Sequence, residues 1–122
     1  MNKKIFVVDD EPDICELVSE GLTEIGYEVT SANTGEKALE EISKIQPNLI
    51  ILDIFIPDMD GVVIYQTLRG MPLFKKTPII FLTALAQGMR PQLAGLNDQA
   101  YSVLPKPISL EEIQKEVKRL LE

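Results

Sequence analysis

Apolar positions in this chain gather into short runs separated by longer amphipathic segments. Three runs are entirely apolar: Ile5–Val8, Leu49–Leu52 and Ile79–Leu82. Four consecutive apolar residues rich in β-branched and aromatic types are typical of strands covered on both faces. Two less apolar segments, Tyr27–Ser31 and Ala100–Leu104, are predicted to be further strands.

The segments between these runs have apolar residues at helical spacing. Asn33 with Glu36, and Ser109 with Glu112, resemble the paired capping residues that start a helix. Helices are therefore predicted over Pro12–Ile25, Asn33–Gln46, Val62–Leu68 and Leu110–Leu121.

The stretch from Leu85 to Leu96 is predicted to be an irregular helix, because Gly88, Pro91 and Gly95 disfavour a regular one. Five strands thus alternate with five helical segments, without a linker or a repeat. Strict alternation predicts one α/β domain over residues 1–122, a doubly wound parallel sheet with helices on both faces.

Composition narrows the classes of function. The chain has 122 residues, a formal net charge of −7 and a pI of about 4.6, so direct binding of nucleic acid by this domain is not expected. With one cysteine, Cys15, and no histidine, a disulfide, zinc or haem site is not expected, whereas carboxylates could hold Mg²⁺. Cys15 is predicted to pack in the core. The apolar run near the N-terminus is too short for a signal peptide or a membrane span, which predicts a cytoplasmic location and no membrane contact.

Polar side chains stand where the predicted strands end. Asp9 and Asp10 follow the first strand, Asp53 follows the third, Thr83 the fourth and Lys106 the fifth. Parallel strands bring their carboxyl ends to one edge of the sheet, where sites of open α/β sheets form. We therefore expect these five residues to share one site.

The chemistry of this set points to phosphoryl transfer. Carboxylates that repel one another favour a divalent cation, with Asp10 and Asp53 as direct ligands and Asp9 acting through water. The Asp53 carboxylate could attack phosphorus and form an acyl phosphate, while Lys106 supplies positive charge and the Thr83 hydroxyl binds an oxygen. Each residue alone would fit a helix cap, a turn or a solvated loop, and only their combination favours a site.

The chain resembles the receiver domains of two-component response regulators over essentially its whole length. The resemblance rests on four motifs that occur in order: Val7-Val8-Asp9-Asp10-Glu11; Leu52-Asp53 with Pro57 and Met59-Asp60-Gly61; Leu82-Thr83-Ala84; and Lys106-Pro107.

This resemblance implies that Asp53 is the phosphoacceptor and that Asp9, Asp10, Asp53 and the backbone carbonyl of Phe55 serve Mg²⁺. It implies that Lys106 contacts the phosphoryl group and that Thr83 moves to bind it. The implied strand order is 2-1-3-4-5, and the implied Lys-Pro bond is cis.

The resemblance also implies partners. The phosphoryl donor would be a histidine kinase or a phosphotransfer protein, and the output a downstream protein target or a fused output domain, with a possible phosphorylation-dependent dimer. Such a domain is not a conventional enzyme, since it catalyses only its own phosphoryl transfer and dephosphorylation.

The chain departs from the family pattern near its fifth strand. Family members usually carry Tyr or Phe three residues before the lysine, where this chain has Val103, and Tyr101 lies two residues earlier. The spacing from Thr83 to Lys106 is also one residue longer. Tyr101 is therefore predicted not to reorient on activation in the usual way.

Two bulky apolar residues bear on the lifetime of a phosphoryl group. Phe55 and Leu85 lie two residues beyond Asp53 and Thr83, positions that border the path of the attacking water in the family. We expect them to slow self-dephosphorylation.

Three rival functions remain open. A receiver-like interaction module that works without phosphorylation would be expected to lose an acid or the lysine, and all are present. An aspartate-nucleophile phosphatase would carry a second Asp where this chain has Phe55. A flavodoxin-like FMN binder would need a Ser/Thr/Gly-rich phosphate loop in place of Asp9–Pro12.

Overall fold

Five parallel strands form the main sheet of this chain. A computed structural model describes residues 3–84 and 101–122. The strands lie in the order β2-β1-β3-β6-β7, and every neighbouring pair is parallel. Counted along the chain this is 2-1-3-4-5, the predicted order. The strands are β1 (Lys4–Val8), β2 (Glu28–Ala32), β3 (Leu49–Asp53), β6 (Ile79–Thr83) and β7 (Tyr101–Pro105).

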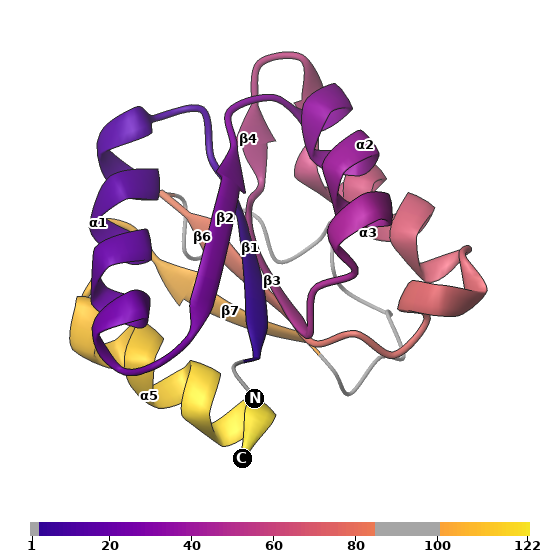
Figure 1. Cartoon of the computed structure of the whole chain (residues 1–122). Helices are drawn as coiled ribbons and strands as arrows, with labels where there is room; N and C mark the ends of the chain where they lie inside the picture. Colours follow the sequence, from indigo (N-terminus) through magenta and orange to yellow (C-terminus); the bar gives the residue numbers. More distant parts are fainter. Residues whose placement is uncertain (1–2, 85–100) are drawn as a thin grey trace.

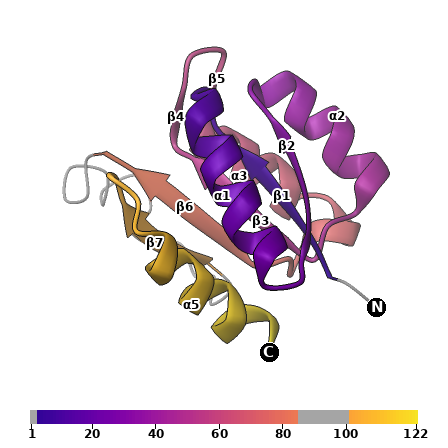
Figure 2. The same ribbon diagram turned by 60° about the vertical axis from the view of Figure 1, so that its left-hand side comes forward.

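Helices cover both faces of the sheet, as predicted. Helices α1 and α5 lie on one face and α2 and α3 on the other (Figure 1, Figure 2). Their bounds are α1 (Pro12–Glu24), α2 (Gly35–Ile45), α3 (Gly61–Arg69) and α5 (Leu110–Leu121). Within the described residues, no helix combines the length and the apolar character that a membrane span requires.

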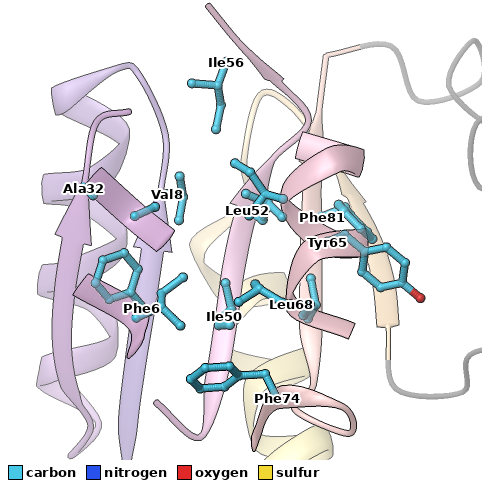
Figure 3. Packing of buried hydrophobic residues seen from close by; sticks show 14 of the residues in the cluster. Phe6, Val8, Ala32, Ile50, Leu52, Ile56, Tyr65, Leu68, Phe74 and Phe81 are labelled. Carbon is cyan, nitrogen blue, oxygen red and sulfur yellow. The ribbon is translucent and has the colours of Figure 1, made fainter. Parts of the chain in front are cut away.

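Strand alternation divides the core in two. Ile5 and Val7 of β1 point toward α1 and α5, whereas Phe6 and Val8 point toward α2 and α3, and all four are fully buried. Figure 3 shows the second cluster, in which Phe6, Val8, Ile50 and Leu52 meet Tyr65 and Leu68 of α3 and Phe74. Cys15 packs in the first cluster, so the prediction of a core role is confirmed.

The predicted start of the second helix was wrong by one residue. Thr34, not Asn33, is the N-cap of α2, and its hydroxyl accepts a hydrogen bond from the Lys37 N–H at 3.2 Å. Both residue types are common N-caps, so the sequence alone does not choose between them. In the structure Thr34 has the extended backbone conformation of an N-cap and Gly35 is the first helical residue. The cap predicted for α5 is confirmed, because the Ser109 hydroxyl accepts from the Glu112 N–H at 3.3 Å.

A small hairpin follows β3 and was not predicted. Its strands are β4 (Phe55–Ile56) and β5 (Met59–Asp60), paired antiparallel. Asp60 then caps α3 by accepting from the Val62 N–H at 2.8 Å, so this helix begins one residue before the predicted Val62. A 3₁₀ turn, Pro72–Phe74, leads toward β6. The irregular helix predicted over residues 85–96 lies outside the described residues.

Candidate functional site

Three aspartates meet at the carboxyl ends of β1 and β3. Asp9 and Asp53 are buried, with 0% and 4% of their surface exposed, and Asp10 is half-buried. One carboxylate oxygen from each of the three lies within 4.8 Å of the others. Strands β1 and β3 are direct neighbours, so residues 44 positions apart in the chain share one end of the sheet.

Lys106 neutralises part of this negative charge. Its Nζ lies 3.0 Å from Asp53 Oδ2, 3.1 Å from Asp9 Oδ2 and 3.0 Å from Glu11 Oε2. The Lys106 N–H donates to the Thr83 carbonyl at 2.7 Å, which fixes the lysine backbone beside β6. The peptide bond between Lys106 and Pro107 is cis, as the family resemblance implied.

Burial shifts the pKa of the buried carboxylates in spite of their polar contacts. Burial raises the pKa of Asp53 to about 6, the Lys106 ammonium opposes this rise, and the Asp9 charge adds to it. Burial also raises the pKa of Asp9. Burial alone would lower the pKa of Lys106, but its contacts with Glu11, Asp53 and Asp9 raise it above the usual value. The lysine therefore stays charged at neutral pH.

The donor set fits a hard divalent cation. Asp9 Oδ2 is buried and has no hydrogen bond within residues 3–84 and 101–122, although the Lys106 ammonium lies 3.1 Å away as an ion pair. The same ammonium is shared with Asp53 and Glu11, so one positive charge faces three carboxylates, and a divalent cation would offset the negative charge that remains. Among residues 3–84 and 101–122 the cluster consists of three carboxylates without a histidine or cysteine ligand, a set that suits Mg²⁺ rather than zinc.

The backbone of Phe55 faces Asp53. Its N–H donates to Asp53 Oδ1 at 3.1 Å. The Gly61 N–H donates to the Ile54 carbonyl at 2.8 Å, which makes Phe55 and Asp60 a non-hydrogen-bonded pair of the hairpin. In such a pair both the N–H and the carbonyl of a residue point away from its partner. The Phe55 carbonyl therefore points to the same side as the N–H that meets Asp53, while the Phe55 side chain is 46% exposed.

Thr83 ends β6 one residue beyond Leu82, the register partner of Asp53. Its side chain is buried, and its carbonyl holds the Lys106 N–H. The structure thus brings Thr83, Lys106 and the three aspartates to the same edge of the sheet.

Sequence reasoning assigned no role to Glu11 or to Gly61. Glu11 reaches Lys106 across 95 positions of chain, and only its place directly after Asp10 could have suggested this. Gly61 faces the backbone of β3, since a Cβ there would lie 2.5 Å from the Asp53 carbonyl oxygen. Only glycine allows α3 to begin this close to the site.

The structure describes only some of the positions near β7 at which the sequence departs from the family pattern. Val103 packs against the core cluster on the α2 and α3 face. Tyr101 begins β7 opposite Ile79, but its side chain lies outside the described part of the structure, as does Leu85. The predictions on Tyr101 reorientation and on Leu85 stay predictions.

Comparison with known proteins assigns the family. The profile of the family described as "Response regulator receiver domain" matches residues 5–118. The chain is 39% identical over 121 residues to the alkaline phosphatase synthesis transcriptional regulatory protein PhoP of Bacillus subtilis, covering 99% of this chain and 49% of PhoP. It is 36% identical over 118 residues to the DNA-binding dual master transcriptional regulator RpaA of Synechocystis, covering 97% of this chain and 48% of RpaA. The chain thus spans about half the length of these curated relatives.

Comparison with solved structures indicates the same family. The chemotaxis response regulator CheY4 of Vibrio cholerae superposes with a TM-score of 0.89 at 32% identity, over 99% of this chain and 100% of CheY4. The chain belongs to the response regulator receiver domain family. It is a phosphoacceptor signalling domain of two-component systems rather than a conventional enzyme.

Proposed function

We propose that Asp53 is the residue of this domain that accepts the phosphoryl group. The observation that carries this proposal is the burial of Asp53 between Asp9 and Lys106, with Lys106 Nζ 3.0 Å from its Oδ2. A carboxylate held beside one fixed ammonium is pre-arranged for a negatively charged reactant. The proposed donor is a phosphohistidine of a histidine kinase or of a phosphotransfer protein.

The proposed cation is Mg²⁺, held by Asp9, Asp10, Asp53 and the carbonyl of Phe55. The clustered carboxylate oxygens and the orientation of the Phe55 carbonyl support this set. When bound, Mg²⁺ neutralises the carboxylates and orients the oxygens of the incoming phosphoryl group.

Asp53, Lys106 and Thr83 have different roles in the proposed phosphoryl transfer. An Asp53 oxygen attacks phosphorus, the bond from phosphorus to the donor nitrogen breaks, and that nitrogen keeps the electron pair. Lys106 moves its ion pair from Asp53 to a phosphoryl oxygen, since the Asp53 carboxylate loses its charge when it is phosphorylated. The Thr83 hydroxyl binds a second oxygen, and the same site later hydrolyses the acyl phosphate with water.

The output of this domain is proposed to be a change in a protein contact surface. It acts on a separate protein target or on a fused output domain, and a phosphorylation-dependent dimer is part of this proposal. Two relatives are named as transcriptional regulators and are about twice as long as this chain, which supports a fused domain. A cytoplasmic location and the absence of direct nucleic-acid contact by this domain belong to the same proposal.

Intact-mass measurement with Mg²⁺ and a small-molecule phosphodonor tests the assignment. We expect a gain of one phosphoryl group in the wild type and in Asp13→Asn, which changes an exposed acid of α1, and none in Asp53→Asn or without metal. A gain in Asp53→Asn would contradict the proposal. A folded wild type that binds no Mg²⁺ and gains nothing would instead favour an interaction module that works without phosphorylation.

Slow self-dephosphorylation is a second part of the proposal. The Phe55 side chain is 46% exposed and follows Asp53 by two residues, a position from which we expect it to hinder attacking water. We expect Phe55→Asn, alone or with Leu85→Glu, to shorten the lifetime of the phosphorylated chain. An unchanged decay of the mass shift in both variants would contradict this part.

A further inference from the structure

The turn of the β4–β5 hairpin is bound to the start of α2. Asp58, in that turn, accepts hydrogen bonds from the Gly35 N–H at 2.9 Å and from the Glu36 N–H at 3.2 Å. Thr34 accepts from the next amide, that of Lys37. All three amides of the first turn thus have side-chain acceptors, and the hairpin supplies two of them. Figure 1 shows β4 and the start of α2 at the same end of the molecule.

The contact between hairpin and helix is closely fitted. A Cβ added to Gly35 would lie 2.8 Å from Met59 Cβ and 3.0 Å from Ile64 Cδ1. The helix therefore begins directly against the hairpin, with no room for a methyl group. A carboxylate at a helix N-terminus is also favoured by the helix dipole, which strengthens this attachment. The hydrogen bonds from Gly35 and Glu36 lower the pKa of Asp58, so its carboxylate is ionised at neutral pH.

The other end of the hairpin belongs to the proposed cation site. Phe55 opens β4, and its N–H meets Asp53 Oδ1 at 3.1 Å. Gly61 closes the base through its hydrogen bond to the Ile54 carbonyl. The hairpin is thus held at its base by Gly61 and at its turn by Asp58. Ile56 and Met59 also pack the hairpin against the core, but within the described residues only Asp58 attaches its turn to α2 by hydrogen bonds. Loss of these hydrogen bonds would loosen the hairpin and let the Phe55 carbonyl shift relative to Asp53.

We propose that Asp58 is a positioning residue for the cation site. It binds the hairpin to α2 and so holds the Phe55 carbonyl where Mg²⁺ is bound, without touching the ion itself. This inference rests on the proposed function, because it assumes that the Phe55 carbonyl is a ligand. Outer partners that orient the ligands of a metal commonly change its affinity by 10- to 100-fold.

The test compares Asp58→Ala, Asp58→Asn and Thr34→Ala by the Mg²⁺ concentration that gives half-maximal phosphorylation. Asp58→Ala is expected to raise this concentration about tenfold and to leave the rate at saturating Mg²⁺ near that of the wild type. Asp58→Asn is expected to be milder, because its amide oxygen can still accept from Gly35. Thr34→Ala removes a cap from the same helix but leaves the hairpin attached, and it should not change the Mg²⁺ requirement.

A second readout needs no metal. Amide hydrogen exchange at Phe55 and Gly61 should be faster in Asp58→Ala than in the wild type and unchanged in Thr34→Ala. If Asp58→Ala shows the wild-type Mg²⁺ requirement and wild-type exchange, the inference is overturned and the proposed function stands. A wild type that neither binds Mg²⁺ nor gains a phosphoryl group overturns both. Asp58→Asn decides the matter if the alanine variant does not fold.

Discussion

The middles of β1 and β3 bury apolar side chains, whereas their carboxyl ends bury carboxylates. The middles are apolar and fully buried, and each side chain meets others of its kind from the helices. One residue further on, Asp9 and Asp53 are just as buried but carry charge, and one lysine serves both of them and Glu11 as well. The same two strands therefore stabilise the fold along their length and destabilise it at their ends.

Within each strand, the residues that stabilise the fold are thus adjacent to those proposed to carry the function. Burying apolar side chains favours folding directly. Burying carboxylates opposes folding until a cation or a phosphoryl group compensates for the lost hydration. We therefore expect substitutions in the middles and at the ends of these strands to change stability in opposite directions.

The largest effect is expected from the core. Ile50→Ala in β3 removes a fully buried side chain and should lower the free energy of unfolding by about 2–5 kcal/mol. Urea unfolding followed by circular dichroism measures this change. Leu73→Ala, at a position 59% exposed, is the matched control. A loss below about 1 kcal/mol for Ile50→Ala would show that the core tolerates the cavity.

At the end of the same strand the sign should reverse. The pKa of Asp53 rises from 3.8 to about 6 on folding, so its contribution to stability is present below pH 3.8 and is lost as the pH rises through 6. Asp53→Asn should therefore stabilise the metal-free protein above pH 6, by up to about 3 kcal/mol. Urea unfolding between pH 4 and pH 7.5 gives the comparison. Asp13→Asn serves as control. If the stability of Asp53→Asn depends on pH as strongly as that of the wild type, the raised pKa does not belong to Asp53.

Mg²⁺ should remove part of the same penalty. At ten times its dissociation constant a ligand of the folded state raises the free energy of unfolding by about 1.4 kcal/mol. We expect this gain in the wild type and its loss in Asp53→Asn, with Na⁺ at equal ionic strength as control. Thermal unfolding monitored at several Mg²⁺ concentrations measures it. Equal stabilisation of both chains would place the cation elsewhere.

The smallest effect is expected far from the site, on α5. The hydrogen bond from Arg119 and that from Ser102 lower the pKa of Glu116 to about 2. Its contribution to stability is therefore present above pH 4.5 and lost as the pH falls toward 2, opposite in direction to that of Asp53. Arg119 is mostly exposed, so Glu116→Gln should cost less than about 1 kcal/mol at pH 7. Acid unfolding shows the effect, with Glu111→Gln as control, and a larger loss in the control would contradict it.

The predictable parts of the molecule are those with local signals. Apolar runs such as Ile79–Leu82 predict buried strands without knowledge of their neighbours, and the strict alternation of elements predicts the layers. The hairpin after β3 has no such pattern, because its two-residue strands are too short to show a period. Asn33 is intrinsically at least as good a cap as Thr34. The start of α2 is decided instead by its contacts with the β4–β5 hairpin, which the sequence does not reveal. The reach of Lys106 to Glu11 is set by the sheet as a whole.

The site also bears on how the chain folds. Asp9, Asp53 and Lys106 lie at the ends of strands that are separated by long stretches of sequence. Pairing of distant strands is slow because loop closure costs entropy before contacts compensate for it. The carboxylates meet only when β1 and β3 are in register, and Lys106 joins them only when β7 has paired with β6. A cation that needs these groups together binds the native state and not states in which the strands are still unpaired. We therefore expect Mg²⁺ to slow unfolding and to leave the refolding rate unchanged. Stopped-flow refolding and unfolding, each with and without Mg²⁺, measure the two rates. The cluster of aspartates would then determine how long the loaded domain stays folded.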